Sequence, residues 1–439
     1  MRGTAHLVSR HRSLLAILAV ALAARLVVLV GYLGTHQWKP EVWEYEQVAQ
    51  NLLAGRGYMF VEAGLERRTF GWPVLPLVSY LLHLIGGKDN FVPYLVFQLA
   101  ASVGIVGLTY WLASRWLNPA TGLVAALLVA LEPGLIVYGS YKVHETTLAT
   151  FLLLVWQGLF VRVRDENRLR WAAVMGLVTG LGILTRGTFV AVFAPLGAWM
   201  LARARVERQT VISGLAVIVL ALLTIAPWTV RNYLVLGRFV LVSSGWSNAF
   251  WRGNNPYSSG ANLTVEGKTY FELASPEFRQ RVFASREMER YDLYRESALR
   301  YIHERPVAFA GRSLKKLRDF FWFPPTYGFM YGVSPGLLVG YQVGYAVMLV
   351  FALLGTVVAL SRGGTTRSTG AYLVILVFAL AGLHAVVYVE GRHKLMVMPI
   401  LLMFSAYGIR HTGVLRSRLE RGRSKPRTSS DALPTVDGG

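Results

Sequence analysis

Long runs of apolar residues alternate with short polar connections along most of the chain. A helix needs about twenty predominantly apolar residues to cross the hydrocarbon core of a bilayer. The pattern therefore predicts an all-α polytopic membrane protein with about ten transmembrane helices. The predicted spans are 13–33, 91–113, 121–139, 146–161, 171–185, 188–202, 211–229, 341–360, 371–389 and 395–410.

Two connections are long, and both fall on the same side of the predicted bundle. The first, 34–90, contains two segments that are expected to lie as helices in the membrane interface. Glu44 to Leu53 has apolar residues at helical spacing, and Pro73 to Ile85 is apolar but too short to span comfortably.

The second long connection, 230–340, precedes the eighth predicted span. Its stretch from Ser243 to Asn262 is rich in Gly, Asn and Ser and is predicted to be a loop. The charged amphipathic segment from Pro276 to Phe323 is predicted to form two helices separated at Pro306.

Arginines gather in the other connections and at the C-terminal end. These basic connections are Arg115, 162–170, 203–208, Arg362 with Arg367, and 410–427. Cytoplasmic loops of membrane proteins carry an excess of Lys and Arg, so both termini are predicted to be cytoplasmic. The long loops, and an active site within them, then lie on the extracytoplasmic side of the plasma (inner) membrane.

Composition supports this interpretation. The 439 residues are 54% hydrophobic and 16% charged, with a mean hydropathy of +0.42, so lipid must solvate much of the surface. The basic residues that give the formal charge of +21 lie mostly in these connections. This distribution indicates contact with anionic membrane lipids and no nucleic-acid partner. Residues 1–410 are expected to form the membrane domain, and 411–439 a basic, disordered cytoplasmic tail.

The chain has no cysteine, which excludes disulfides, thiolate metal sites and cysteine nucleophiles. A metal would need His, Asp or Glu ligands. No cofactor is predicted with certainty, and a divalent metal stays open.

Two acidic clusters on the outer side are candidates for catalysis. Glu41 and Glu44 lie in the first outer loop, where a carboxylate above the membrane suits a general base facing an anionic group. An equally acceptable explanation is the solvated face of an interfacial helix.

His144 and Glu145 open a predicted span, where the helix dipole favours an acid without any function. They are candidates for positioning an acceptor or holding a metal.

Cations on the same side are candidates for binding a phosphate. They are Arg68, Arg231, Arg392, His393 and Lys394. Arg231 could also be an interface anchor. The last three are predicted to open the final helix, where a phosphate would gain helix-end amides and paired cations.

The order of these motifs resembles a known family. In the first outer loop the motifs are Glu41, Glu44-Tyr45, Asn51-Leu52, Gly55-Arg56-Gly57-Tyr58 and Arg68 to Pro73. Further along they are Glu145, Leu184-Thr185-Arg186, Pro227 to Tyr233 and Arg392-His393-Lys394. Over most of its length the chain is similar to GT-C membrane glycosyltransferases of family 39, the protein O-mannosyltransferase and lipid A aminoarabinose transferase type.

The resemblance implies an inverting transfer of a hexosyl or pentosyl sugar from a polyprenyl-phosphate carrier to a protein, glycolipid or cell-envelope acceptor. It implies that Glu41, with Glu44 as the alternative, is the general base. It also implies that Arg68, Arg231, Arg392, His393 and Lys394 hold the donor phosphate. Two departures are evident: the family base is usually Asp, and the last motif usually reads Glu-x-Arg-Tyr where this chain has Glu390-Gly391-Arg392-His393.

Two other classes compete with an enzyme: a transporter or flippase of lipid-linked sugars, and a non-catalytic membrane scaffold. A transporter should place ionisable residues near the midplane and often shows internal repeats. Here the charges gather at one interface and no repeat is visible, so the sequence favours the enzyme.

Overall fold

The protein is built almost entirely of helices. The computed structural model describes the backbone of residues 2–62, 64–69, 71–166, 168–203, 207–264, 266–323 and 334–423, and their side chains except for 2–9 and 413–423. The first half contains α1 (Arg2–Thr35), α2 (Glu44–Leu53), α3 (Val74–Gly86), α4 (Val92–Trp116), α5 (Pro119–Leu131), α6 (Pro133–Ser140), α7 (Glu145–Glu166) and α8 (Leu169–Thr185). The second half contains η1 (Gly187–Val192), α9 (Phe193–Arg203), α10 (Arg208–Leu236), α11 (Gly245–Gly253), α12 (Tyr270–Leu273), α13 (Pro276–Ala284), α14 (Glu287–Glu304), α15 (Pro306–Phe321), α16 (Pro335–Ser361), α17 (Gly364–Val386), η3 (His393–Met396) and α18 (Met398–Arg423).

The membrane architecture agrees with the predicted fold class. Among the described residues, α1, α4, α7, α10, α16 and α17 are each long and apolar enough to cross a bilayer, and α5 with α6 adds a seventh candidate if that bent pair is one span. The remaining predicted spans coincide with the shorter α8, with η1 and α9, and with η3 and α18. The protein is therefore an integral membrane protein of α-helices, while the number ten is not confirmed.

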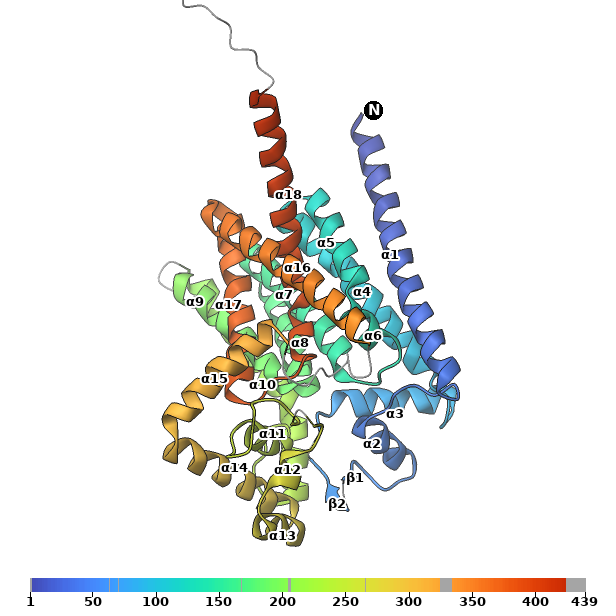
Figure 1. Ribbon diagram of the computed structural model, residues 1–439, viewed down its shortest axis with the longest axis vertical. Coiled ribbons are helices and arrows are strands. Elements are labelled where there is room, and N and C mark those ends of the chain that lie inside the picture. Colours follow the sequence, from blue (N-terminus) through green and yellow to red (C-terminus); the bar gives the residue numbers. More distant parts are fainter. Residues whose placement is uncertain are drawn as a thin grey trace, which may run out of the picture.

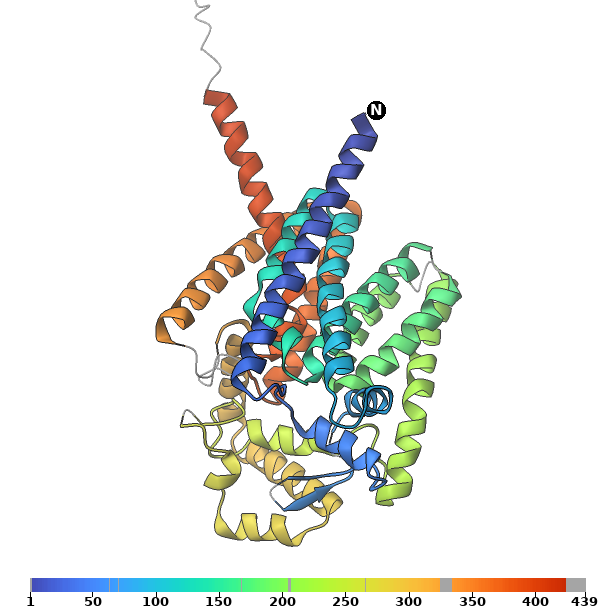
Figure 2. The ribbon, with the colours of Figure 1, turned by 90° about the vertical axis from the view of Figure 1, so that its right-hand side faces the viewer.

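Both long connections lie at one end of the bundle. Figures 1 and 2 show the ends of α1 and α18 at the opposite end from α2, α3 and α11 to α14. The two predicted interfacial helices are present as α2 and α3. Between them lies a hairpin of β1 (Phe60–Glu62) and β2 (Leu65–Arg67), which pairs Val61 with Glu66. The sequence analysis did not predict this hairpin, because strands of three residues are too short to show a period.

The second connection is more helical than predicted. The helix α11 occupies 245–253 inside the segment that was predicted to be a loop. Its Phe250 and Trp251 are buried, and Trp251 stacks on Phe278 of α13, so tertiary packing stabilises a helix that its Gly, Asn and Ser content disfavours. The break at Pro306 is confirmed, since α14 ends at Glu304 and α15 begins at Pro306.

The C-terminal helix also differs from the prediction. It continues to Arg423, so its end lies beyond the predicted span of 395–410, and the cytoplasmic tail stays a prediction. Between Gly413 and Gly422 the helix contains neither Gly nor Pro, the residues that commonly end a helix. Residues 424–439 lie outside the described part of the chain.

Glycines bring the spanning helices close together. Gly176 and Gly180 of α8 face α10, where an added Cβ would lie 2.8 Å from the carbonyl oxygens of Val217 and Ala221 respectively. Small residues four apart let two helix backbones approach closely in a membrane, where packing replaces the hydrophobic effect as the driving force. Gly355 of α16 similarly packs against the backbone of α18 at Phe404.

Candidate active site

A pocket of about 590 Å³ lies where the two long connections, 34–90 and 230–340, meet the helical bundle. This volume is within the range of small-molecule sites, which are roughly 300–1,000 Å³. Its charged and imidazole side chains come from α7, the end of α8, α17 and the turn before η3. They are Glu145, Arg186, His384, Arg392 and His393. Apolar and aromatic residues, among them Trp72, Trp246 and Tyr388, complete the lining.

Glu145 is the acidic centre of this pocket. It is the first residue of α7 and is buried. Its Oε2 accepts a hydrogen bond from the Tyr45 hydroxyl at 2.5 Å and lies 2.9 Å from Nδ1 of His144, while Oε1 lies 3.6 Å from Nη1 of Arg186. A buried carboxylate needs such partners to offset its lost hydration. The prediction that His144 and Glu145 start a span is confirmed, and the two residues contact each other.

Arg392 is the main cation on the other wall. Its Nη2 forms a 2.7 Å ion pair with Glu390, and its guanidinium lies over the ring of Trp43, 5.3 Å from the centroid. Its buried Nε has no hydrogen-bond partner among the described residues. The ring of the next residue, His393, stacks on that of His384 at 3.9 Å. A guanidinium with an unpaired N–H in a pocket is suited to an incoming anion.

The structure corrects the expected position of this cationic cluster. It does not open the final helix, because His393–Met396 form a 3₁₀ turn and α18 begins only at Met398. Lys394 is directed away from the pocket lining, and its Nζ donates to the carbonyl of Trp322 at 2.5 Å and lies over the rings of Phe323 and Tyr345. A phosphate beside Arg392 would therefore not lie at the N-terminus of α18, as the sequence predicted.

Arg231 and Arg68 also lie elsewhere. Arg231 donates to the carbonyls of Arg68 at 2.8 Å and Tyr58 at 3.2 Å, and its guanidinium lies over the rings of Tyr58 and Trp228. The side chain of Arg68 is exposed and pairs with Glu66. Neither arginine lines the pocket. Of the five predicted phosphate-binding residues, the structure places Arg392 and His393 in its wall.

Neither candidate base is among the residues that line the pocket, and the two differ in their surroundings. The carboxylate of Glu41 pairs with the ammonium of Lys142 and accepts from Nε1 of Trp43 at 3.1 Å. Glu44, in the first turn of α2, has no such cation bonded to it among the described contacts. Burial raises the pKa of Glu44, the charge of Glu145 raises it further, and Arg392 opposes both.

Several residues of this region escaped the sequence analysis. Arg186 was noted in the Leu-Thr-Arg motif but was not selected, although it lies beside Glu145. His384 gave no signal, because a single His in an apolar helix is indistinguishable from a core residue. Glu287 also gave none, although its carboxylate accepts from the backbone N–H groups of Arg68 (2.6 Å) and Thr69 (2.9 Å) and from the Ser244 hydroxyl (2.7 Å).

The described residues contain no group of three or more His, Cys, Asp or Glu side chains that could hold a metal ion. The oxygens of Glu145 already contact Tyr45, His144 and Arg186, all of which would compete with a metal. The His144 and Glu145 pair is therefore a poor metal site by its geometry.

Comparison with known proteins agrees with the resemblance. Residues 71–230, which include Trp72, Glu145 and Arg186 of the pocket, match the family model described as dolichyl-phosphate-mannose-protein mannosyltransferase. None of the curated protein sequences matches the chain significantly.

Solved structures of an archaeal oligosaccharyltransferase share the fold at low sequence identity. The apo oligosaccharyltransferase of Archaeoglobus fulgidus superposes with a TM-score of 0.58 at 13% identity, over 93% of this chain and 52% of that chain. The AglB oligosaccharyltransferase of the same organism, in complex with an inhibitory peptide and a dolichol-phosphate, gives 0.55 at 12% identity, over 97% and 52%. ArnT from Cupriavidus metallidurans bound to undecaprenyl phosphate gives 0.44 at 14% identity, over 94% and 81%.

The chain spans about half the length of the archaeal enzymes that it matches. The matched segment and the shared fold agree with the resemblance to GT-C membrane glycosyltransferases.

Proposed function

We propose that the protein is an inverting glycosyltransferase that moves a sugar from a polyprenyl-phosphate carrier to an acceptor at the outer face of the membrane. The observation that carries this proposal is the pocket that places Arg186, Arg392 and His393 close to the carboxylate of Glu145. Opposite charges at one membrane interface suit a reaction in which a phosphate leaves and a proton is taken up.

The family model and the archaeal complex support a lipid-phosphate donor. The matched model is named for a dolichyl-phosphate-mannose substrate, and the AglB structure contains a dolichol-phosphate. A carrier of this kind is held in the bilayer and reaches a pocket at the interface by lateral diffusion. The acceptor is a protein, a glycolipid or a cell-envelope glycan, and the transferred sugar is a hexose or pentose.

In the proposed reaction, a nucleophilic group of the acceptor attacks the anomeric carbon from the side opposite the phosphate. A bond forms between the acceptor and the sugar, the bond from the anomeric carbon to the phosphate oxygen breaks, and the configuration inverts. The acceptor proton passes to a carboxylate, and the carrier leaves as polyprenyl phosphate. Arg392 and Arg186 stabilise the negative charge on the departing phosphate, where preorganised cations are most effective.

The environment of Glu44 favours it over Glu41 as the general base. Glu41 is already paired with Lys142, whereas the carboxylate of Glu44 is coupled electrostatically to Glu145 and Arg392. A raised pKa brings a carboxylate closer to the optimum for a base near neutral pH. Glu145 and His144 position the acceptor in this proposal.

The position of the pocket disfavours a transporter. Substrate sites of transporters typically lie near the bilayer midplane. Here Glu145 begins α7 and Arg186 directly follows α8, so the charged groups lie at the ends of helices.

The decisive experiment is mass spectrometry of lipid-linked sugars and envelope glycans from a strain that lacks the gene. Complementation with the wild type should restore one glycan and consume its lipid-linked precursor, whereas an Arg392→Gln variant should leave the precursor accumulated. Arg170→Gln is the matched control, because Arg170 is exposed beside Trp171 and does not line the pocket. Unchanged lipid-linked sugars and glycans in the deletion strain would contradict the proposal.

A further inference from the structure

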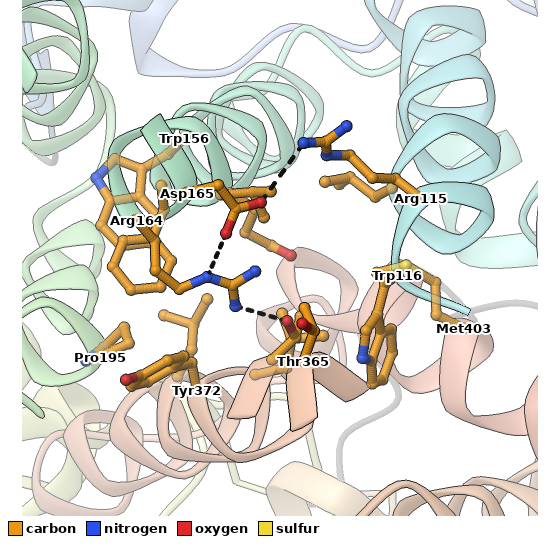
Figure 3. Close-up of a pocket in the computed structure, with 16 residues that line it drawn as sticks. Arg115, Trp116, Trp156, Arg164, Asp165, Pro195, Thr365, Tyr372 and Met403 are labelled. Atoms are coloured by element: carbon orange, nitrogen blue, oxygen red, sulfur yellow. Dashed lines mark hydrogen bonds and ion pairs between the residues drawn. The ribbon is translucent and has the colours of Figure 1, made fainter. Parts of the chain in front are cut away.

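A second cavity lies at the other end of α7 from the candidate active site. It has a volume of about 210 Å³ and lies between α4, α7, α9, α17 and α18 (Figure 3). Glu145 begins α7, whereas the residues of α7 that line this cavity are Trp156 to Asp165. At 1.5 Å per residue, Glu145 and Asp165 are about 30 Å apart along the helix, so the two pockets are separate.

The walls of the cavity are largely apolar and aromatic. Trp116, Trp156, Phe160, Tyr372 and Met403 contribute to them. An empty apolar cavity of about 150 Å³ in a protein is large enough to bind benzene. A cavity of this size and composition therefore accommodates part of a hydrocarbon chain.

Gln157 is the polar exception in the depth of the cavity. It lines the cavity and is only 3% exposed, and within the described part of the chain neither its Nε2 nor its Oε1 has a hydrogen-bond partner. Leaving a buried amide without partners is costly, so such a group indicates a molecule that satisfies it.

Two arginines lie at the mouth of the cavity. Figure 3 shows Asp165 between Arg115 and Arg164, with distances of 3.4 Å to Nη2 of Arg115 and 2.9 Å to Nε of Arg164. Arg164 also donates from Nη1 to the Thr369 hydroxyl at 2.6 Å. One carboxylate faces two guanidinium groups, so the mouth keeps a net positive charge, and the Arg115 side chain is still 51% exposed.

These features lie on one face of α7. Gln157, Phe160 and Arg164 are three, four and seven residues apart, which places them in a row along the helix. The amide is therefore about 10 Å deeper in the bundle than the arginine. A ligand that reaches both has an anionic group at one end, a carbonyl further in and a hydrocarbon part beyond.

We propose that this cavity binds an anionic phospholipid of the leaflet opposite the active site. The phosphate lies against Arg115 and Arg164, an acyl-ester carbonyl accepts a hydrogen bond from Nε2 of Gln157, and the chain lies against the aromatic walls. Basic pockets between transmembrane helices commonly bind anionic lipid head groups. The apolar walls favour a lipid over free phosphate, which would leave them without a partner. The proposal does not depend on the chemistry of the other pocket.

Native mass spectrometry of the purified full-length protein tests this site. The protein is loaded with a defined mixture of phosphatidylglycerol and phosphatidylcholine. We expect one phosphatidylglycerol to be retained preferentially, and Arg115→Gln to lower its retention about tenfold through loss of a charge-assisted hydrogen bond. Gln157→Leu should lower retention less, because a neutral hydrogen bond is weaker. Arg170→Gln, which alters a basic side chain outside the cavity, should retain the lipid as the wild type does.

Four outcomes would overturn the proposal. The first is equal retention of both phospholipids, and the second is retention that neither Arg115→Gln nor Gln157→Leu changes. The third is displacement of the lipid by inorganic phosphate at equal concentration, which would leave phosphate as the occupant. The fourth is absence of lipid from the wild type, which would leave water as the occupant. Arg115 is half-exposed, so its variant should fold, and size-exclusion chromatography checks both variants.

Discussion

Glu41 and Glu44 are three residues apart, yet their carboxylates have different partners. The carboxylate of Glu41 is occupied by an ion pair with the ammonium of Lys142. Glu44 is desolvated and close enough to Glu145 and Arg392 to be affected by both charges. A base must accept a proton in the transition state, so the less strongly paired carboxylate is better suited to the reaction.

We therefore expect Glu44→Gln to lower kcat by about 10²–10⁴-fold, the usual contribution of a general base. Glu41→Gln is the matched control and should lower it less than tenfold. Both are measured as sugar release from a polyprenyl-phosphate donor in the presence of acceptor. An inactive Glu41→Gln beside an active Glu44→Gln would assign the base to Glu41.

The pH dependence offers a second test of Glu44. Burial raises its pKa above the usual 4.5, and only the ionised form accepts a proton, so kcat/KM should rise with pH through a limb above 4.5. Arg392 lowers the pKa of Glu44, so Arg392→Gln should move this limb to higher pH while lowering the plateau. A limb that stays in place in this variant would contradict the coupling.

The sequence predicted several residues of the site, but it did not predict which of them lie together in one pocket. Glu145, Arg392 and His393 were selected in advance and line one pocket. Lys394 follows His393 directly but contacts Trp322 instead, because the 3₁₀ turn directs successive side chains to different sides. The direction of each side chain in an irregular turn depends on contacts with distant segments, so it cannot be predicted from the local sequence.

At the scale of the elements, the pattern of apolar residues predicted where helices occur more accurately than where each helix begins and ends. The α2 helix has the bounds that were expected, because apolar spacing and turn residues agree there. The expected span at 121–139 is instead a pair of helices bent by 60°, and Pro133 begins the second of them. Hydropathy alone does not distinguish a straight apolar run from a bent one.

Close packing of α8 on α10 allows a test of helix association. Gly180→Leu should destabilise the protein by about 1–3 kcal/mol, because the new side chain would overlap the backbone at Ala221 and the side chain of Thr224. Gly197→Leu in α9 is the matched control, since a Cβ at that position meets no atom within 4 Å. Thermal unfolding in detergent compares the two, and equal midpoints would refute close approach at Gly180.

At the scale of the whole molecule, the two described ends of the chain lie at the same end of the bundle, opposite to α2, α3 and α11 to α14 (Figure 1). The distribution of arginines predicts that this end faces the cytoplasm. That orientation rests on charge counts over many loops and stays a prediction. The meeting of the two long connections could not be predicted from the sequence, because it depends on contacts between residues more than 200 positions apart.

The absence of cysteine makes the orientation directly measurable, because every introduced thiol is unique. In intact cells, Arg281→Cys should react with a membrane-impermeant maleimide, while Arg168→Cys should react only after the membrane is opened. Both side chains are exposed; Arg281 lies in α13, whereas Arg168 follows the end of α7 that is remote from Glu145. The reverse labelling pattern would place the termini outside.

The carboxylate of Glu287 fixes the spacing between the two long connections before any ligand arrives. It bonds Thr69, three residues before Trp72, and Ser244, next to Ser243, and both Trp72 and Ser243 line the pocket. Because these hydrogen bonds would have to break for the pocket to change width, closing it around a ligand is costly. A ligand must therefore fit the pocket as it is before binding. The pocket would then select among sugars by the size and shape of the sugar that enters it. Widening the pocket to admit a larger sugar would require a substitution at Glu287 as well as at the lining residues.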